Sequence, residues 1–161
     1  MRLGAHIHVS APPSAVWEII SDPTRQLSYM SGITRWEVSG EPPAGLGARY
    51  RMLLRVGSAE VGGLIELVEF VPDREIAWTS VTGVDQRGRW RLREAPDGRT
   101  KVELRLAYGV AGSGFGGWVA EHVAAPTVSA HLRRSLQQLA RLVEAEQVRA
   151  RAAARRTAQR A

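Results

Sequence analysis

The sequence predicts an α+β domain in which an antiparallel sheet of seven strands is combined with one long C-terminal helix. Residues 5–10 alternate between apolar and polar side chains, as in a half-buried strand. From residue 33 to residue 110, six further strand-like segments follow one another with short turns between them, which favours an antiparallel meander. After this meander, residues typical of one helix face recur at steps of four and three from residue 118 to residue 143.

Two short helices are predicted between the first strand and the meander. Pro12 and Pro13 open a helical segment that extends to Ile20. Asp22 and Pro23 end that segment and begin a second helical turn, which reaches residue 30. The six strands of the meander are then expected at residues 33–39, 47–56, 60–71, 75–82, 86–94 and 100–110.

Pairing these strands through their turns gives registers that place charged pairs on one face of the sheet and apolar pairs on the other. The opposite residues are Arg49 and Glu66, Arg55 and Glu60, Tyr50 and Ile65, Met52 and Gly63, Leu54 and Val61, Arg91 and Glu103, Trp90 and Leu104, Leu92 and Val102, Trp78 and Trp90, and Ser80 and Gly88. The fourth strand must turn different residues inward for its two neighbours, so we expect a bulge near Leu67. The arginines of the sixth strand fall on the outer face, at Arg87, Arg89, Arg91 and Arg93.

The long helix carries a stripe whose two halves differ in character. Its members are Trp118, His122, Ala125, Ser129, Leu132, Leu136, Leu139 and Val143. The last four are aliphatic core residues, whereas the first four mix aromatic, ionisable and small side chains. Such a mixture is typical of the wall of a cavity. His131 lies off the stripe, and we expect it at the surface.

Composition narrows the class of protein. The 161 residues, 44% hydrophobic and 24% charged, suit a single globular domain. The absence of cysteine excludes disulfides and thiolate ligands, and the four histidines have no recognisable metal-ligand spacing, so we expect no metal and no cofactor. No stretch reaches the roughly 18 apolar residues of a membrane span, and no apolar signal segment precedes the first strand. We therefore expect a cytoplasmic protein, a monomer or a homodimer.

The net charge of +6 is concentrated at the C-terminal end of the sequence. Residues 1–146, the predicted domain, contain 17 of the 22 basic residues and all 16 acidic ones. Residues 147–161 form a tail rich in alanine and arginine, which we expect to be a solvated extension of the last helix. The alternative is that the tail contacts nucleic acid or an anionic membrane.

Two phrases in the sequence resemble a known superfamily. They are IHVSAPPSAVW at residues 7–17 and VEFVPDREIAW at residues 68–78. Together with the order of strand, two short helices, six strands and long helix, they resemble the START-like superfamily, and most of all its polyketide cyclase/dehydrase branch, over residues 2–144. The resemblance implies a helix-grip fold, in which a curved antiparallel sheet wraps around the last helix and a ligand cavity lies between them.

The inward positions of this fold define a predicted ligand site. Its ligand-binding wall comprises Met52, Leu54, Ile65, Trp78, Ser80, Trp90, Leu104, Leu106, Trp118 and Ser129. Gly63 and Gly88 also fall inward, where a missing side chain leaves room. We expect a hollow that binds a small hydrophobic ligand, whether aromatic, polyketide-like or lipid-like, on which the tryptophans could stack. The alternative is that bulky neighbours close over these positions and form a solid core.

A polyketide cyclase or dehydratase is the alternative function. Such an enzyme needs an acid or base beside the carbonyl groups of its substrate, and His122 is the candidate because imidazole titrates near neutral pH. Tyr50 and Tyr108 would orient the carbonyl groups. Aromatase/cyclases of the superfamily tend to hold an arginine inside, whereas every arginine on the paired strands falls outward here. The glycine-rich residues 112–117 are predicted to form a loop over the cavity entrance. A further alternative is an interaction module that acts through its basic tail.

Overall fold

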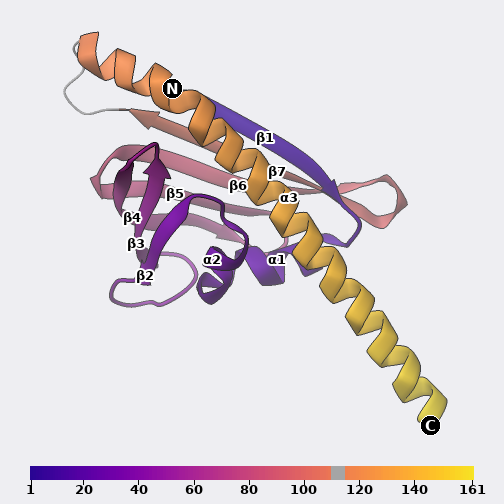
Figure 1. The fold of residues 1–161 in the computed structure, drawn as a ribbon. Helices are drawn as coiled ribbons and strands as arrows, with labels where there is room; N and C mark the ends of the chain where they lie inside the picture. The colour runs from indigo at the N-terminus through magenta and orange to yellow at the C-terminus, as the bar shows by residue number, and fades with distance from the viewer. Residues whose placement is uncertain (110–114) are drawn as a thin grey trace.

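The structure, a computed structural model, describes residues 1–109 and 115–161, and the side chains of residues 1–109 and 123–161. Its elements are β1 (Arg2–Val9), α1 (Pro13–Ile20), η1 (Pro23–Arg25), α2 (Gln26–Tyr29), β2 (Ile33–Val38), β3 (Arg49–Val56), β4 (Ala59–Val71), β5 (Glu75–Gly83), β6 (Asp85–Ala95), η2 (Pro96–Gly98), β7 (Arg99–Gly109) and α3 (Phe115–Arg160). The seven strands form one antiparallel sheet in the order β1-β7-β6-β5-β4-β3-β2. The sheet curls around α3, which crosses it obliquely (Figure 1). The predicted helix-grip fold is confirmed.

Local sequence signals explain where the short helices begin. Pro13 occupies the first turn of α1, where its missing N–H is not needed, and Val16, Ile19 and Ile20 give the helix a buried side. Asp22 then accepts a hydrogen bond from the backbone N–H of Thr24 at 2.9 Å and so caps η1. A hydrogen bond from the Thr24 hydroxyl, together with this one from the N–H, lowers the pKa of the Asp22 carboxyl.

Most of the predicted strand registers are confirmed. Across β3 and β4, Arg49 lies opposite Glu66 and Arg55 opposite Glu60. Across β6 and β7, Arg91 lies opposite Glu103, with the predicted apolar pairs on the other face. The pairing of β4 with β5 shifts between Leu67 and Glu69, which is the predicted bulge, and it shifts a second time between Leu64 and Ile65.

The predicted register of β5 with β6 is wrong by two residues. Trp78 lies opposite Gly88, not Trp90, and the ladder ends at Thr79 opposite Arg87, so the described ladder does not pair Ser80 with β6. The end of β5 turns toward β4 instead, and the N–H of Val84 donates to the carbonyl of Gly62 at 3.1 Å. Because the error is an even number of residues, every side chain keeps the face that was predicted for it.

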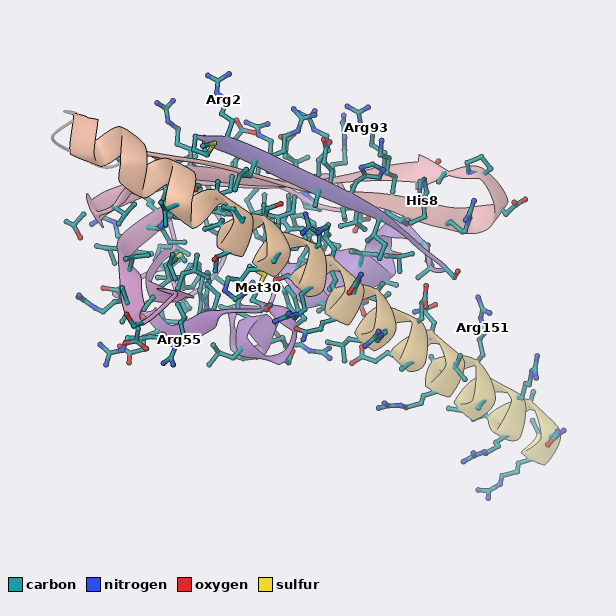
Figure 2. The ribbon with its side chains drawn as sticks, turned by 45° about the horizontal axis from the view of Figure 1, so that its top comes forward. Arg2, His8, Met30, Arg55, Arg93 and Arg151 are labelled. Carbon is teal, nitrogen blue, oxygen red and sulfur yellow. The ribbon has the colours of Figure 1, made fainter. Side chains whose placement is uncertain are left out.

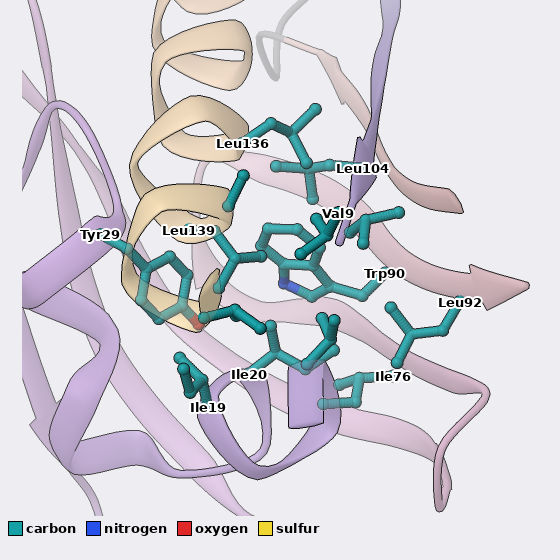
Figure 3. Close-up of a cluster of buried hydrophobic side chains, with 14 of the residues drawn as sticks. Val9, Ile19, Ile20, Tyr29, Ile76, Trp90, Leu92, Leu104, Leu136 and Leu139 are labelled. Atoms are coloured by element: carbon teal, nitrogen blue, oxygen red, sulfur yellow. The ribbon is translucent and has the colours of Figure 1, made fainter. Parts of the chain in front are cut away.

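The solid core occupies much of the half of the curl that lies nearest α1. Leu136 and Leu139 of α3 point toward the concave face of the sheet, where Trp90 and Leu104 lie (Figure 3). Leu132 and Val143 extend the same buried stripe, as predicted. Each aliphatic side chain buried in this way contributes about 1.5–3 kcal/mol relative to its exposed state. The other labelled members of the cluster are Val9, Ile19, Ile20, Tyr29, Ile76 and Leu92.

Polar contacts tie α3 to the rest of the domain along its length. The backbone N–H of Ser10 donates to Glu144 at 2.9 Å, and Arg25 forms an ion pair with Glu146. The ring of His131 is half-buried, not at the surface as predicted. Its Nε2 lies 3.0 Å from the carbonyl oxygen of Arg55 and its Nδ1 lies 3.0 Å from the Ser31 hydroxyl.

Helix α3 continues far beyond the sheet. Its 46 residues include Pro126, and its last turns project into solvent with side chains such as Arg151 pointing away from the domain (Figure 2). The residues after Gln147 are exposed except for Ala152, which is half-buried. Within the described residues, no helix combines the length and the apolar character that a membrane crossing needs.

Candidate functional site

An apolar cavity lies between the concave face of the sheet and the N-terminal half of α3. This outer chamber has a volume of about 230 Å³. Its wall includes Met52, Leu54, Val61, Leu106, Tyr108 and Val128, and Gln86 adds a polar amide group to it. The strands supply these residues because alternate positions of β3, β4, β6 and β7 face inward.

A second, smaller cavity lies deeper in the curl, next to the short helices. This inner chamber has a volume of about 50 Å³ and is lined by aromatic residues among others. Its lining includes Trp36, Tyr50, Met52, Ile65, Trp78 and Trp90. In the parts of both linings that the structure describes, no side chain carries a formal charge.

Met52 separates the two chambers. Its side chain lines both of them, and only 8% of it is exposed. The amide Nε2 of the buried Gln86 donates to the Met52 sulfur at 3.7 Å, a weak hydrogen bond that orients the methionine. Three rotatable bonds make a methionine side chain easy to displace compared with a branched residue.

Most of the sequence-predicted wall residues line one chamber or the other. Met52, Leu54, Leu106 and Tyr108 lie in the outer chamber, and Tyr50, Met52, Ile65, Trp78 and Trp90 lie in the inner chamber. Leu104 is buried in the core and lies in neither described lining. Ser80 sits at the end of β5, where its hydroxyl accepts a hydrogen bond from the N–H of Gln86 at 3.2 Å. The side chains of Trp118 and His122, and residues 112–114 of the predicted entrance loop, lie outside the described residues. Residues 115–117 of that predicted loop instead form the first turn of α3.

The cavity-facing stripe of α3 differs from the predicted one. Ala124 and Val128 face the outer chamber, whereas Ser129 lies outside both linings as far as the structure describes them. The Ser129 hydroxyl instead accepts a hydrogen bond from Arg133 at 2.8 Å. Because α3 crosses the curled sheet obliquely (Figure 1), the residues that face the sheet drift around the helix from one half to the other.

The two inward glycines do not open the hollow that was predicted from them. A Cβ at Gly88 would lie 1.8 Å from Cζ2 of Trp78, so the indole ring already fills that space. A Cβ at Gly63 would lie 2.1 Å from the carbonyl oxygen of Thr82, so this glycine allows two strands to approach closely. The chambers owe their space to the curl of the sheet and to the small Ala124 on α3.

Trp36 and Gln86 are site residues that the sequence prediction missed. Gln86 shares the inward parity of Gly88 and Trp90 on β6, so the alternation could have identified it. Trp36 lies opposite Met52 in the register of β2 with β3, and its ring stacks on Tyr50 with centroids 4.7 Å apart. The sequence prediction contained no register for β2 with β3, and this register is what places Trp36 beside Met52.

The electrostatics of the site follow from its burial. Desolvation raises the pKa of the Tyr50 hydroxyl, which therefore stays protonated at neutral pH and donates to the carbonyl of Pro43 at 3.1 Å.

On the outer face of the sheet, Arg89 and Arg91 form ion pairs with Glu75. Arginine side chains such as Arg93 point outward there (Figure 2), as predicted. Among residues 1–109 and 123–161, no group of three or more histidine or acidic side chains is placed to hold a metal ion.

The fold and its matches define the class of protein: this is a member of the START-like superfamily. Within it, the chain belongs to the family described as polyketide cyclase/dehydrase and lipid transport, whose model matches residues 2–144. No curated protein matches the sequence.

Solved structures share the fold at low sequence identity. A protein of Thermus thermophilus, TTHA0849, is 22% identical with a TM-score of 0.77, over 91% of this chain and 99% of that one. The Zhui aromatase/cyclase from Streptomyces is 20% identical with a TM-score of 0.75, over 89% of this chain and 93% of that one. A protein of Deinococcus radiodurans, DR_A0006, is 20% identical with a TM-score of 0.66, over 91% of this chain and 99% of that one. At these identities the likeness concerns the fold.

Proposed function

We propose that the protein binds a small hydrophobic molecule in the outer chamber, between the sheet and α3. The observation that carries the proposal is the apolar wall of this chamber, in which Leu54, Val61 and Leu106 face Val128 and Gln86 supplies a polar amide. Ligand sites are typically such concave apolar surfaces with a few placed polar groups. The family description, which includes both cyclases and lipid transport, supports the same class of ligand.

The volume limits the size of the ligand. The outer chamber of about 230 Å³ lies below the roughly 300–1,000 Å³ that is usual for drug-sized ligands. The inner chamber adds about 50 Å³ if Met52 moves aside. A molecule with one or two fused rings, or a short acyl chain, therefore fits better than a long lipid.

Native mass spectrometry tests this proposal directly. Protein purified gently from its own or a related host is expected to carry a stoichiometric apolar adduct, which denaturation then releases for identification. The variant Ala124→Phe places a ring in the outer chamber and is expected to lose the adduct. Val123→Phe is the matched control, because Val123 is the preceding residue on α3 and is 73% exposed. An adduct that survives in Ala124→Phe would contradict the assignment to this chamber.

A polyketide cyclase or dehydratase is the second candidate function. The family description and the structural likeness to an aromatase/cyclase favour it. In this mechanism His122 would move protons at carbons beside the carbonyl groups, and Tyr50 and Tyr108 would orient those carbonyl groups. As far as the structure describes them, the linings of the two chambers carry no charged side chain, which suits the binding of an apolar ligand.

Turnover is tested with a synthetic poly-β-ketone thioester and product analysis by liquid chromatography. The cyclase function predicts cyclised product with the wild-type protein and a loss of roughly 10²-fold or more in rate in His122→Ala. Equal rates in the two proteins would exclude His122 as the acid or base. Absence of product alongside a stoichiometric adduct would leave ligand binding as the function.

A further inference from the structure

Two tryptophans of the inner chamber have buried hydrogen-bond donors that are not used. Trp36 and Trp78 both line this chamber, and the indole Nε1 of each is buried without an acceptor anywhere in the described part of the chain. Trp36 is held in place by its stacking on Tyr50, and Trp78 by the fit of its ring over Gly88. Neither ring can turn its N–H to solvent without breaking that packing.

An indole N–H can donate but cannot accept a hydrogen bond, so only an acceptor atom satisfies it. A buried donor without a partner is unfavourable, and native structures rarely keep one. The described lining of the inner chamber offers no charged acceptor, and its volume of about 50 Å³ exceeds the roughly 10–15 Å³ that a cavity needs to hold one water. The chamber therefore has the size and the donors to receive an oxygen atom together with the carbon that bears it.

Met52 stands between the outer chamber and this one. It lines both chambers, lies opposite Trp36 in the strand register, and is held by Gln86 through its sulfur. For a ligand in the outer chamber, the direct path to the indole donors runs through the position of the Met52 side chain, which such a ligand must displace. Once Met52 moves, the amide of Gln86 loses its sulfur partner and becomes a further donor to the ligand.

We propose that the ligand of this protein is an apolar molecule that ends in a hydrogen-bond-accepting oxygen, such as a ketone or a quinone, and that this oxygen enters the inner chamber past Met52 to accept a hydrogen bond from Trp36 or Trp78. The inference rests on the proposed binding function and assigns the orientation and the chemical class of the ligand. Trp36, Trp78 and Met52 then determine specificity.

Two matched probes test this proposal. Acetylnaphthalene and ethylnaphthalene have nearly the same shape, and only the first carries a carbonyl oxygen. Nuclear magnetic resonance of isotope-labelled protein reports both the indole N–H signals of the five tryptophans and the methyl signals of Met52, Leu54 and Val61. Both probes are expected to shift the methyl signals of the outer chamber, whereas only the ketone shifts the indole signals of Trp36 or Trp78.

Affinity gives a second, independent readout. One additional hydrogen bond predicts that the ketone binds roughly two- to tenfold more tightly than the hydrocarbon. This preference is expected to disappear in Trp36→Phe or Trp78→Phe and to persist in Trp17→Phe, whose ring packs on Phe70 outside both chambers as described. If a chamber variant does not fold, the indole signals of the wild-type protein still decide the question.

The outcomes separate this inference from the binding function itself. Methyl shifts with both probes but unchanged indole signals would overturn the inference, because the inner chamber would then hold water only. No shift of any chamber signal with either probe would overturn the proposed binding of small aromatic ligands, and the inference with it. Indole shifts that occur with the ketone alone would support both.

Discussion

The close fit of Trp78 over Gly88 can be broken by a single methyl group. In Gly88→Ala the new Cβ would lie 1.8 Å from Cζ2 and 2.2 Å from Cε2 of Trp78, far inside any contact distance that packed atoms tolerate. These residues lie opposite each other on β5 and β6, so the backbone cannot separate them without disturbing the ladder. The ring must therefore move, and the inner chamber is the space it can enter.

The expected cost of this change follows from two opposing effects. Overpacking a core position costs typically 1–3 kcal/mol. Replacing glycine by alanine within a strand returns about 0.5–1 kcal/mol through the lower entropy of the unfolded chain. We therefore expect Gly88→Ala to lower the free energy of unfolding by about 1–2 kcal/mol. For a chain of this length the corresponding fall in Tm is about 2–8 °C.

Urea unfolding followed by circular dichroism measures the effect, with Gly4→Ala as the matched control. Gly4 also lies in a strand, but a Cβ there would meet its nearest atom, Cγ of Arg105, at an ordinary 3.6 Å. Gly4→Ala is expected to be neutral or slightly stabilising. Equal stabilities of the two variants would refute the packing argument, as would an indole signal of Trp78 that does not move in Gly88→Ala.

Three further predictions concern other parts of the fold. Thr100→Val removes a fully buried hydroxyl that donates to the carbonyl of Ala11 at 2.7 Å. It should lower the free energy of unfolding, measured by thermal unfolding, by about 1–3 kcal/mol. An unchanged Tm would argue against this bond. The ion pair with Arg25 lowers the pKa of Glu146, so its contribution is present at neutral pH and is lost as the pH falls through that lowered value. Both side chains are about one third exposed, so Glu146→Gln should cost less than about 1 kcal/mol at neutral pH and nothing in acid, as measured by urea midpoints across pH; a constant difference would contradict this. Removal of residues 147–161 should leave Tm unchanged, because this part of α3 is almost wholly exposed, and unchanged binding to nucleic acid and anionic liposomes at low salt would show that the tail has no role there.

Strand alternation allowed much of the sheet to be predicted. The face that a strand residue occupies depends only on whether it lies an odd or an even number of positions from a residue of known face. The predicted faces of β5 therefore remained correct although its register with β6 was wrong. That register was missed because the end of β5 follows β4 beyond Thr79 instead of pairing with β6. Turn residues alone do not reveal such a change of partner.

The details of the site depended on contacts between distant segments. Gly88 was predicted to leave a hollow, but whether the space opposite a glycine is empty depends on the side chain that reaches it, here Trp78. Ser129 was predicted to face the cavity because the helix was treated as straight and aligned with the sheet. The periodicity of a sequence describes one helix or strand at a time, and it does not give the angle at which a helix crosses a sheet.

Pro126 separates two parts of α3 that we expect to differ in local stability. The proline has no N–H, so α3 lacks one backbone hydrogen bond just where Ala124 and Val128 cover the outer chamber. Beyond this point Leu132, Leu136 and Leu139 anchor the helix in the solid core. Amide hydrogens before Pro126 are therefore expected to exchange through small local openings, and those of the buried stretch from Leu132 to Val143 only when the whole domain unfolds. The ligand that we propose would then enter and leave through the first kind of opening, so its exchange and the unfolding of the domain would be governed by separate barriers.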